Sequence, residues 1–227
     1  MELLSTFVTA PGRGFDELRK QPRFLFPLLL TLLCLSVTLI WYYSSVDFVW
    51  LREQVLSASM RNLSAAERTR AEGLLSRNTI MWTAVIGGLI GIIVQRTIES
   101  TYYYLAGQVT SVRHSFGDWF AFSCWTALPL VLGVVPAMTL LALNNSHQLA
   151  TPQLQALSLN ELFFHRGPQE KGFSLLSSLT VLHFLAWGLA LIGVRVWSGR
   201  SWAFSAGFTL LFPLVYYGGW AVLAFAL

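Results

Sequence analysis

The stretch FLFPLLLTLLCLSVTLIWYY, residues 24–43, contains no charged residue and ends in three consecutive aromatic side chains. A helix needs about 20 apolar residues to cross the hydrocarbon of a bilayer, because each residue adds about 1.5 Å of rise. Pro27 falls in the first turn, where its missing N–H costs little, and Trp and Tyr are enriched at membrane interfaces. The stretch therefore predicts a transmembrane helix over about residues 24–45.

The composition extends this prediction to the whole chain. Of its 227 residues, 55% are hydrophobic and only 11% are charged, whereas an ordinary soluble domain carries about 25% charged residues. No Pro-, Gly- or Ser-rich linker divides the chain, so we expect a single membrane unit over residues 1–227. Further apolar segments of spanning length lie at about residues 79–105, 120–143, 173–194 and 202–227. The expected fold is an all-α integral membrane protein, a bundle of five transmembrane helices.

Charged residues interrupt the second segment, which contains IIVQRTIESTYYYL at residues 92–105. Its purely apolar part, residues 80–94, is too short for a bilayer at about 1.5 Å per residue. We therefore expect the helix to continue to the tyrosines, with Arg96 in the inner half of the membrane and Glu99 nearer its cytoplasmic edge. Two interpretations stay open: a topology anchor that follows the positive-inside bias, and a buried polar site that shapes function.

Ionisable residues inside membrane segments are costly and are by default functional candidates. The candidate site consists of Gln95, Arg96, Glu99 and Tyr103 on the second helix and His183 near the middle of the fourth. Arg96 and Glu99 can pair at i,i+3 spacing. His183 alone is more typical of a hydrogen-bonded bundle residue, and a position facing Arg96 or Glu99 would favour a functional role.

Two glycine pairs are candidates for helix packing. Gly87 and Gly91 form a GxxxG motif in the second helix, and Gly218 and Gly219 lie in the fifth. Small residues let two helix backbones approach closely in lipid. Contact between helices of one chain and a dimer interface both fit this pattern, and the sequence does not separate them.

Prolines predict kinks in two of the helices. Pro129 and Pro136 lie in the third segment and Pro213 lies midway along the fifth. Within a membrane such prolines bend a helix rather than end it, because neighbouring groups satisfy the freed carbonyl. A role in packing shape and a role as a gating hinge both remain open.

The charge distribution predicts the topology. Basic residues are dense before the first helix and recur in the short loop VRVWSGRS, residues 194–201, which favours a cytoplasmic N-terminus and an outside C-terminus. In the first outside loop, FVWLREQVLSASM at residues 48–60 has helical apolar spacing, and Ser64 with Glu67 forms a capping-box signal. We expect a short helical hairpin there, resting on the bilayer.

Motifs for catalysis, metals and nucleotides are absent from the sequence. The histidines are dispersed at positions 114, 147, 165 and 183, and no HExxH, GxSxG or phosphate-binding loop occurs. The basic residues are scattered over helix ends, which argues against nucleic-acid binding. We therefore expect no enzymatic activity, no cofactor and no metal.

Four features of the chain form a recognisable order: LSTFVTAPGRGFDELRKQPRFLFPLLL, YYYLAGQVTSVRHSFGDWFAFSCWTALPLVLG, SLNELF and a final helix pair joined by a basic loop. On these features the chain resembles the Yip family, membrane proteins named for interacting with Ypt/Rab GTPases, and within it the bacterial branch. The resemblance implies a five-helix bundle with a cytoplasmic N-terminus and a role in membrane trafficking or shaping through partners. It supplies no catalytic residues. The chain lacks the long N-terminal region and the aspartate-leucine-tyrosine-glycine-proline motif of eukaryotic relatives, which argues against GTPase binding.

Two functions follow as hypotheses. The first is a non-enzymatic adaptor or organiser of membrane components in a bacterial inner membrane, with the lipid bilayer, a second copy or other membrane proteins as partners. The alternative is a small-solute or ion permease that uses the polar cluster of the second helix.

Overall fold

The structure is a computed structural model that describes residues 2–59 and 75–226. Its helices are α1 (Glu2–Thr9), α2 (Pro11–Lys20), α3 (Leu25–Ser45), α4 (Phe48–Ser59), α6 (Arg77–Thr110), α7 (Phe116–Thr126), α8 (Val134–Leu143), α9 (Phe173–Ser178), α10 (Val181–Ser198) and α11 (Trp202–Ala226). Short turns of 3-10 or π-helix lie at Leu128–Gly133, Thr151–Leu154 and Asn160–Phe164. Among the described residues, five helical segments are long and apolar enough to cross a membrane: α3, α6, α7 with α8, α10 and α11. The chain is an all-α, multi-pass membrane protein, as expected.

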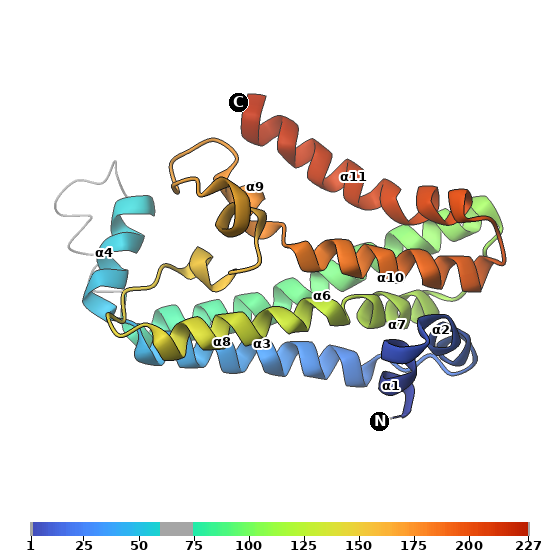
Figure 1. The fold of residues 1–227 in the computed structure, drawn as a ribbon, viewed down its shortest axis with the longest axis horizontal. Helices are drawn as coiled ribbons and strands as arrows, with labels where there is room; N and C mark the ends of the chain where they lie inside the picture. Colours follow the sequence, from blue (N-terminus) through green and yellow to red (C-terminus); the bar gives the residue numbers. More distant parts are fainter. Residues whose placement is uncertain (1, 60–74, 227) are drawn as a thin grey trace.

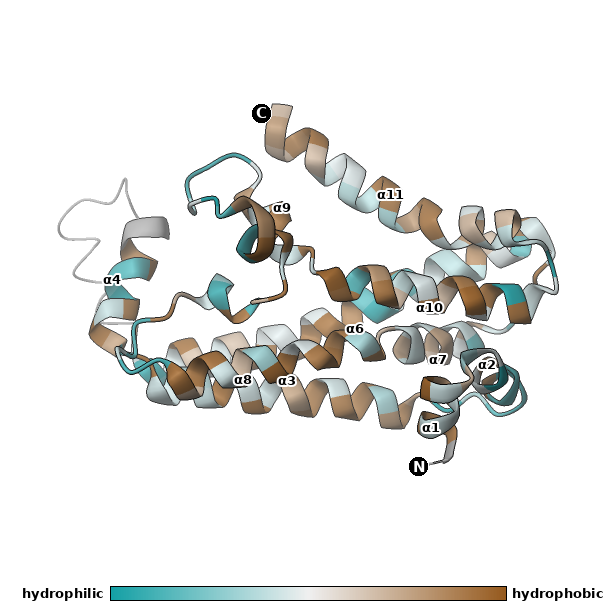
Figure 2. Cartoon of the chain, in the orientation of Figure 1, coloured by the Kyte–Doolittle hydropathy of each residue, from teal (hydrophilic) through white to brown (hydrophobic). Residues whose placement is uncertain are grey.

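The spanning helices lie along one common direction, and α11 diverges from α10 towards its C-terminal end (Figure 1). Their surfaces are mostly hydrophobic, whereas α2 and several connections are hydrophilic (Figure 2). The helices α1 and α2 fold against the end of the bundle where α3 begins and α10 ends. We call this end the α2 end.

An aromatic core fills the α2 end. Phe15 and Leu18 of α2 are fully buried there, and Phe7 of α1 stacks on Trp125 of α7 with ring centroids 4.5 Å apart. The indole N–H of Trp197 in α10 donates to the carbonyl of Phe15 at 2.9 Å. The N-terminal hairpin is therefore part of the folded core.

A second cluster closes the opposite end. The hydroxyl of Tyr42 donates to the carbonyl of Leu149 at 2.8 Å, which ties α3 to the loop after α8. Arg77 donates to the carbonyl of Tyr43 at 2.6 Å and so caps the last turn of α3. The helix α4 matches the first part of the expected hairpin, while the second part, with its capping-box signal at residues 64–67, lies outside the described residues.

The fourth apolar segment differs from the expectation. A continuous helix over 173–194 is expected, but α9 ends and α10 begins only at Val181, and the spanning helix is Val181–Ser198. Between them the backbone is extended and pairs with a distant loop: Leu159 N–H donates to Leu179 O at 2.8 Å, and Val181 N–H donates to Leu157 O at 3.0 Å. These bonds supply the partners that a helical ladder would otherwise provide.

The three prolines occupy different local settings. Pro129 lies in the 3-10 turn that separates α7 from α8, and Pro136 lies in the first turn of α8. Pro213 lies inside α11 and is buried. A hinge role for any of them stays a prediction.

Candidate functional site

Four polar residues of α6 share one face of the helix, which runs unbroken for 34 residues through the charges and tyrosines. Arg96, Glu99, Ser100 and Tyr103 recur at spacings of three, four and seven, which places them on one stripe. The stripe faces α7, from which Ser123 approaches.

Arg96 is buried, with 7% of its surface exposed. Its Nη1 atom lies 2.7 Å from Glu99 Oε2 and donates to the carbonyl of Ser123 at 3.1 Å. Both contacts use the same nitrogen atom, so the guanidinium does not bind the carboxylate in a bidentate arrangement. Arg96 therefore neutralises a carboxylate on its own helix and also links α6 to α7.

Hydroxyl groups complete the cluster. The Oγ of Ser100 donates to the carbonyl of Arg96 at 2.5 Å and lies 2.9 Å from the Oγ of Ser123. The hydroxyl of Tyr103 donates to Glu99 Oε1 at 3.4 Å, and its ring stacks on Trp119 with centroids 5.4 Å apart. Each oxygen of Glu99 thus has a partner within the chain, which offsets the cost of burying its charge.

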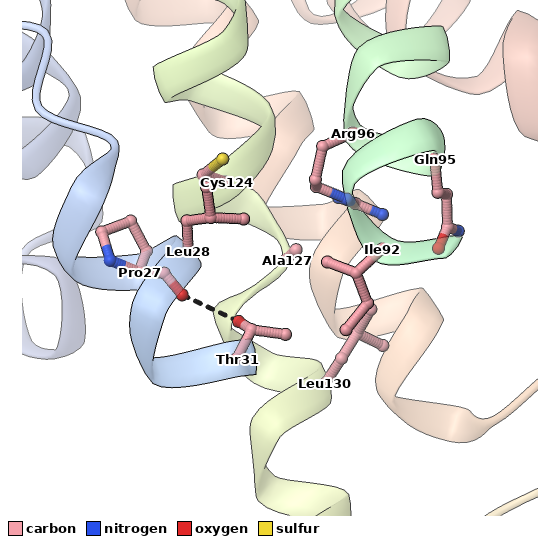
Figure 3. Close-up of a pocket in the computed structure, with 9 residues that line it drawn as sticks. All are labelled: Pro27, Leu28, Thr31, Ile92, Gln95, Arg96, Cys124, Ala127 and Leu130. Atoms are coloured by element: carbon pink, nitrogen blue, oxygen red, sulfur yellow. Dashed lines mark hydrogen bonds between the residues drawn. The ribbon is translucent and has the colours of Figure 1, made fainter. Parts of the chain in front are cut away.

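A small cavity of about 40 Å³ borders the cluster on the side of α3 (Figure 3). It is lined by Pro27, Leu28, Thr31, Ile92, Gln95, Arg96, Cys124, Ala127 and Leu130. A cavity needs roughly 10–15 Å³ to hold a water molecule, while small-molecule sites occupy about 300–1,000 Å³. The space suits one or two water molecules rather than a solute.

A comparison with protein family models matches residues 5–225 to the Yip1 domain. The chain belongs to the Yip1 domain family. Comparisons of the chain with the curated proteins and with the solved structures find no match. The resemblance to the Yip family is thereby confirmed, and membership of its bacterial branch stays a prediction.

The Yip1 domain brings together three of the five candidate site residues. Arg96, Glu99 and Tyr103 are in direct contact. Gln95 is exposed on α6 and borders the cavity. Among the described residues, no group of three His, Cys, Asp or Glu side chains is placed to hold a metal ion.

His183 lies elsewhere than expected. It is expected near the middle of a helix, but α10 begins at Val181, so His183 is in the first turn. Its Nδ1 accepts the backbone N–H of Thr180 at 3.1 Å and lies 2.9 Å from the Thr180 hydroxyl. The free N–H groups of a helix start need acceptors, so the break before α10 turns His183 into a capping residue.

The packing glycines also differ from the expected set. A Cβ atom built on Gly87, Gly91, Gly218 or Gly219 would meet no described atom within 4 Å. Close approach occurs instead at Gly88, where a Cβ would lie 2.8 Å from Leu35, and at Gly193, where it would lie 2.6 Å from Phe15. Contact within one chain therefore uses other glycines, and the dimer alternative for the GxxxG motif stays a prediction.

Ser100 and Ser123 are members of the cluster that the sequence analysis missed. The position of Ser100, four residues after Arg96, places it on the same helical face and could have identified it. Ser123 carries no such signal, because its place depends on how α7 packs against α6.

Proposed function

We propose that this Yip1 domain protein is a non-enzymatic organiser of membrane components, which recruits other membrane proteins or a second copy through its lipid-facing helices. One observation carries the proposal: the face of α6 formed by Gly87, Ile90, Gly91 and Val94 is exposed along its length. Nothing in the described chain covers the two glycines. In lipid, such a face lets a partner helix approach closely. We call it the open face of α6.

The polar cluster supports this proposal over a permease. Its ion pair, Arg96 with Glu99, is closed by contacts within the chain, and the adjoining cavity of about 40 Å³ is too small for most solutes. A transport site needs groups that exchange their partners for the solute. We infer that the cluster joins α6 to α7 and so fixes the surface that α6 presents to lipid.

The test is photo-crosslinking in native membranes. A photoreactive amino acid replaces Ile90, which is 56% exposed on the open face, and in a control chain it replaces Val135 of α8, which is 66% exposed. We expect a discrete protein adduct from position 90 and lipid adducts from position 135. Gly91→Ile in the position-90 chain should abolish the adduct, because the larger side chain fills the space that a partner backbone would enter.

Two outcomes would contradict the proposal. One is lipid adducts alone from both positions. The other is ion or solute flux in liposomes that contain the purified protein, provided that Arg96→Ala and Glu99→Gln abolish this flux. That result would favour the permease.

We further propose that the protein lies in a bacterial inner membrane with its N-terminus in the cytoplasm and its C-terminus outside. We do not propose GTPase binding.

A further inference from the structure

Basic side chains from separate parts of the chain gather at the α2 end. The described segments at this end are residues 2–24, 111–118 and 195–201, and they contain seven basic and four acidic residues. The basic ones are Arg13, Arg19, Lys20, Arg23, Arg113, Arg195 and Arg200. Figure 2 shows hydrophilic residues on α2 and on the connection between α10 and α11.

At the opposite end of the bundle, the described residues include equal numbers of basic and acidic side chains. This end carries Arg52, Arg77, Arg166 and Lys171 against Asp47, Glu53, Glu161 and Glu170. The positive charge of the described chain is therefore concentrated at one end of the bundle. A surface of one sign attracts ions of the other sign over roughly a Debye length.

The depth of these residues matches the headgroup layer of a bilayer. Arg23 lies two residues before α3 and Arg200 lies two residues before α11. The 21 residues of α3 span about 31 Å, close to the thickness of the hydrocarbon core. Because α3 and α11 begin two residues after Arg23 and Arg200, a bilayer that covers these helices would place both side chains at the level of the lipid phosphates.

Hydrogen bonds and aromatic contacts within the chain fix two of these basic side chains, Arg195 and Arg200. Arg195 Nη1 donates to the carbonyl of Arg200 at 2.6 Å, and Arg200 Nη2 donates to the carbonyl of Thr110 at 2.7 Å. The two guanidinium groups lie over the rings of Trp202 and Phe204, at 4.7 and 4.6 Å from the centroids. Aromatic and basic side chains side by side are typical of the headgroup level.

Other basic side chains at this end are available to a ligand. Arg13, Lys20 and Arg113 are exposed, and the side chains of these three have no hydrogen-bond or ion-pair partner among the described residues. They come from α2 and from the connection between α6 and α7, which pack around Trp197.

We propose that the α2 end is a binding surface for anionic phospholipid headgroups, with Arg13, Lys20 and Arg113 as phosphate contacts. Clusters of basic residues next to spanning helices attract anionic lipids by charge. The inference rests on the membrane-spanning fold and is independent of the proposed organiser function. It implies that the protein gathers anionic lipids around one end of its bundle.

The experiment uses the full chain in phosphatidylcholine vesicles that contain either brominated phosphatidylglycerol or brominated phosphatidylcholine. Bromine quenches nearby tryptophans, and Trp202 is 53% exposed at the α2 end. We expect the anionic lipid to associate about tenfold more strongly than phosphatidylcholine. Lys20→Gln/Arg113→Gln should lose almost all of this preference, because each of the two charges contributes about 1 kcal/mol, or about fivefold, and raised salt should weaken it in the unmodified chain.

The matched control is Lys171→Gln/Arg52→Gln, which removes one lysine and one arginine from the opposite end. Its lipid preference should equal that of the unmodified chain. Equal quenching by both lipids, or equal losses in the two variants, would overturn the proposal. Loss of the preference on adding millimolar inorganic phosphate would assign the surface to a soluble anion instead. No lipid preference, combined with charge-dependent protein adducts in native membranes, would assign it to an acidic protein.

Discussion

At the residue scale, Arg96 links α6 to α7 through a single nitrogen atom. Arg96→Met would leave Glu99 charged and buried without its partner, which costs about 3–5 kcal/mol of the free energy of unfolding. Arg96→Lys keeps a charge with three donors on a side chain one atom shorter, and we expect a smaller loss of about 1–2 kcal/mol. Unfolding by titration with SDS in mixed micelles measures the free energy of unfolding of both variants.

The double variant Arg96→Met/Glu99→Leu provides the control. Removing both charges leaves no unpaired ion, so the double variant should be more stable than Arg96→Met alone. If Arg96→Met were as stable as the unmodified chain, the topology-anchor interpretation would hold.

Gly193 and Gly188 form a matched pair on α10. A Cβ on Gly193 would lie 2.6 Å from the ring of Phe15 and would also meet Phe122, while a Cβ on Gly188 would meet no described atom within 4 Å. Gly193→Ala should therefore destabilise the protein by about 1–3 kcal/mol through overpacking. Gly188→Ala should be neutral or stabilising by up to about 1 kcal/mol, because alanine favours the helix. Thermal unfolding of the two variants gives the comparison, and equal effects would contradict the packing seen at Gly193.

His114 predicts a pH dependence of stability. It lies between α6 and α7, with its ring 4.7 Å from that of Trp197, and burial lowers its pKa below the ordinary value of 6.5 despite opposing contributions from the Trp197 backbone and Asp118. As the pH falls, His114 is therefore protonated in the unfolded chain before it is protonated in the folded chain. The stabilisation is complete above about pH 6.5 and is lost as the pH falls towards the folded-state pKa.

The midpoint of thermal unfolding should thus drop between pH 7.5 and pH 5.5. In His114→Gln the drop should be smaller, since the variant lacks the titrating ring. An identical drop in both proteins would assign the effect to other groups.

The sequence predicts part of the polar cluster between α6 and α7. Arg96, Glu99 and Tyr103 could be grouped because their spacing on one helix depends only on helical geometry. The position of Ser123 could not be predicted, because it depends on a contact between helices distant in sequence. The capping role of His183 could not be predicted either, because the helix start that it caps follows a break paired with a distant loop.

At the scale of elements, a local cap stabilises the start of α10, just after the break that follows α9. His183 accepts the N–H of Thr180, and loss of a helix cap costs about 1 kcal/mol. His183→Phe should therefore raise hydrogen exchange at the start of α10 by about fivefold. Trp187→Phe is the control, because Trp187 also contacts the ring of Tyr217 but makes no cap. Unchanged exchange in His183→Phe would show that the loop pairing alone holds the break.

The break itself illustrates a limit of sequence patterns. The residues around Leu179 and Thr180 are apolar or small, so they fit the hydropathy of a continuous helix. The backbone is extended here because it pairs with the loop at Leu157–Leu159, which is distant in sequence from residues 179–181. Hydropathy predicts that a segment enters the membrane but does not predict where distant backbone groups replace its helical bonds.

At the scale of the whole molecule, the apolar segments predict a bundle of spanning helices, because every backbone group in lipid needs a partner and helices provide one locally. The role of α1 and α2 is not visible in that pattern. They are too short to span a bilayer, yet Phe7, Phe15 and Leu18 belong to the same core as Trp119 and Trp197. The N-terminal hairpin therefore folds with the spanning helices.

This shared core predicts cooperative unfolding. Phe15→Ala removes a ring that is fully buried against Phe122 and Phe7, so it should cost about 3–5 kcal/mol. Hydrogen exchange should rise in α7 and α10 as well as in α2, and the thermal midpoint should fall. Val8→Ala is the control, because Val8 is 76% exposed and its loss should change stability by less than about 0.5 kcal/mol. If Phe15→Ala increased exchange only in α1 and α2 at an unchanged midpoint, the hairpin would be a separate unit resting on a bundle that folds without it.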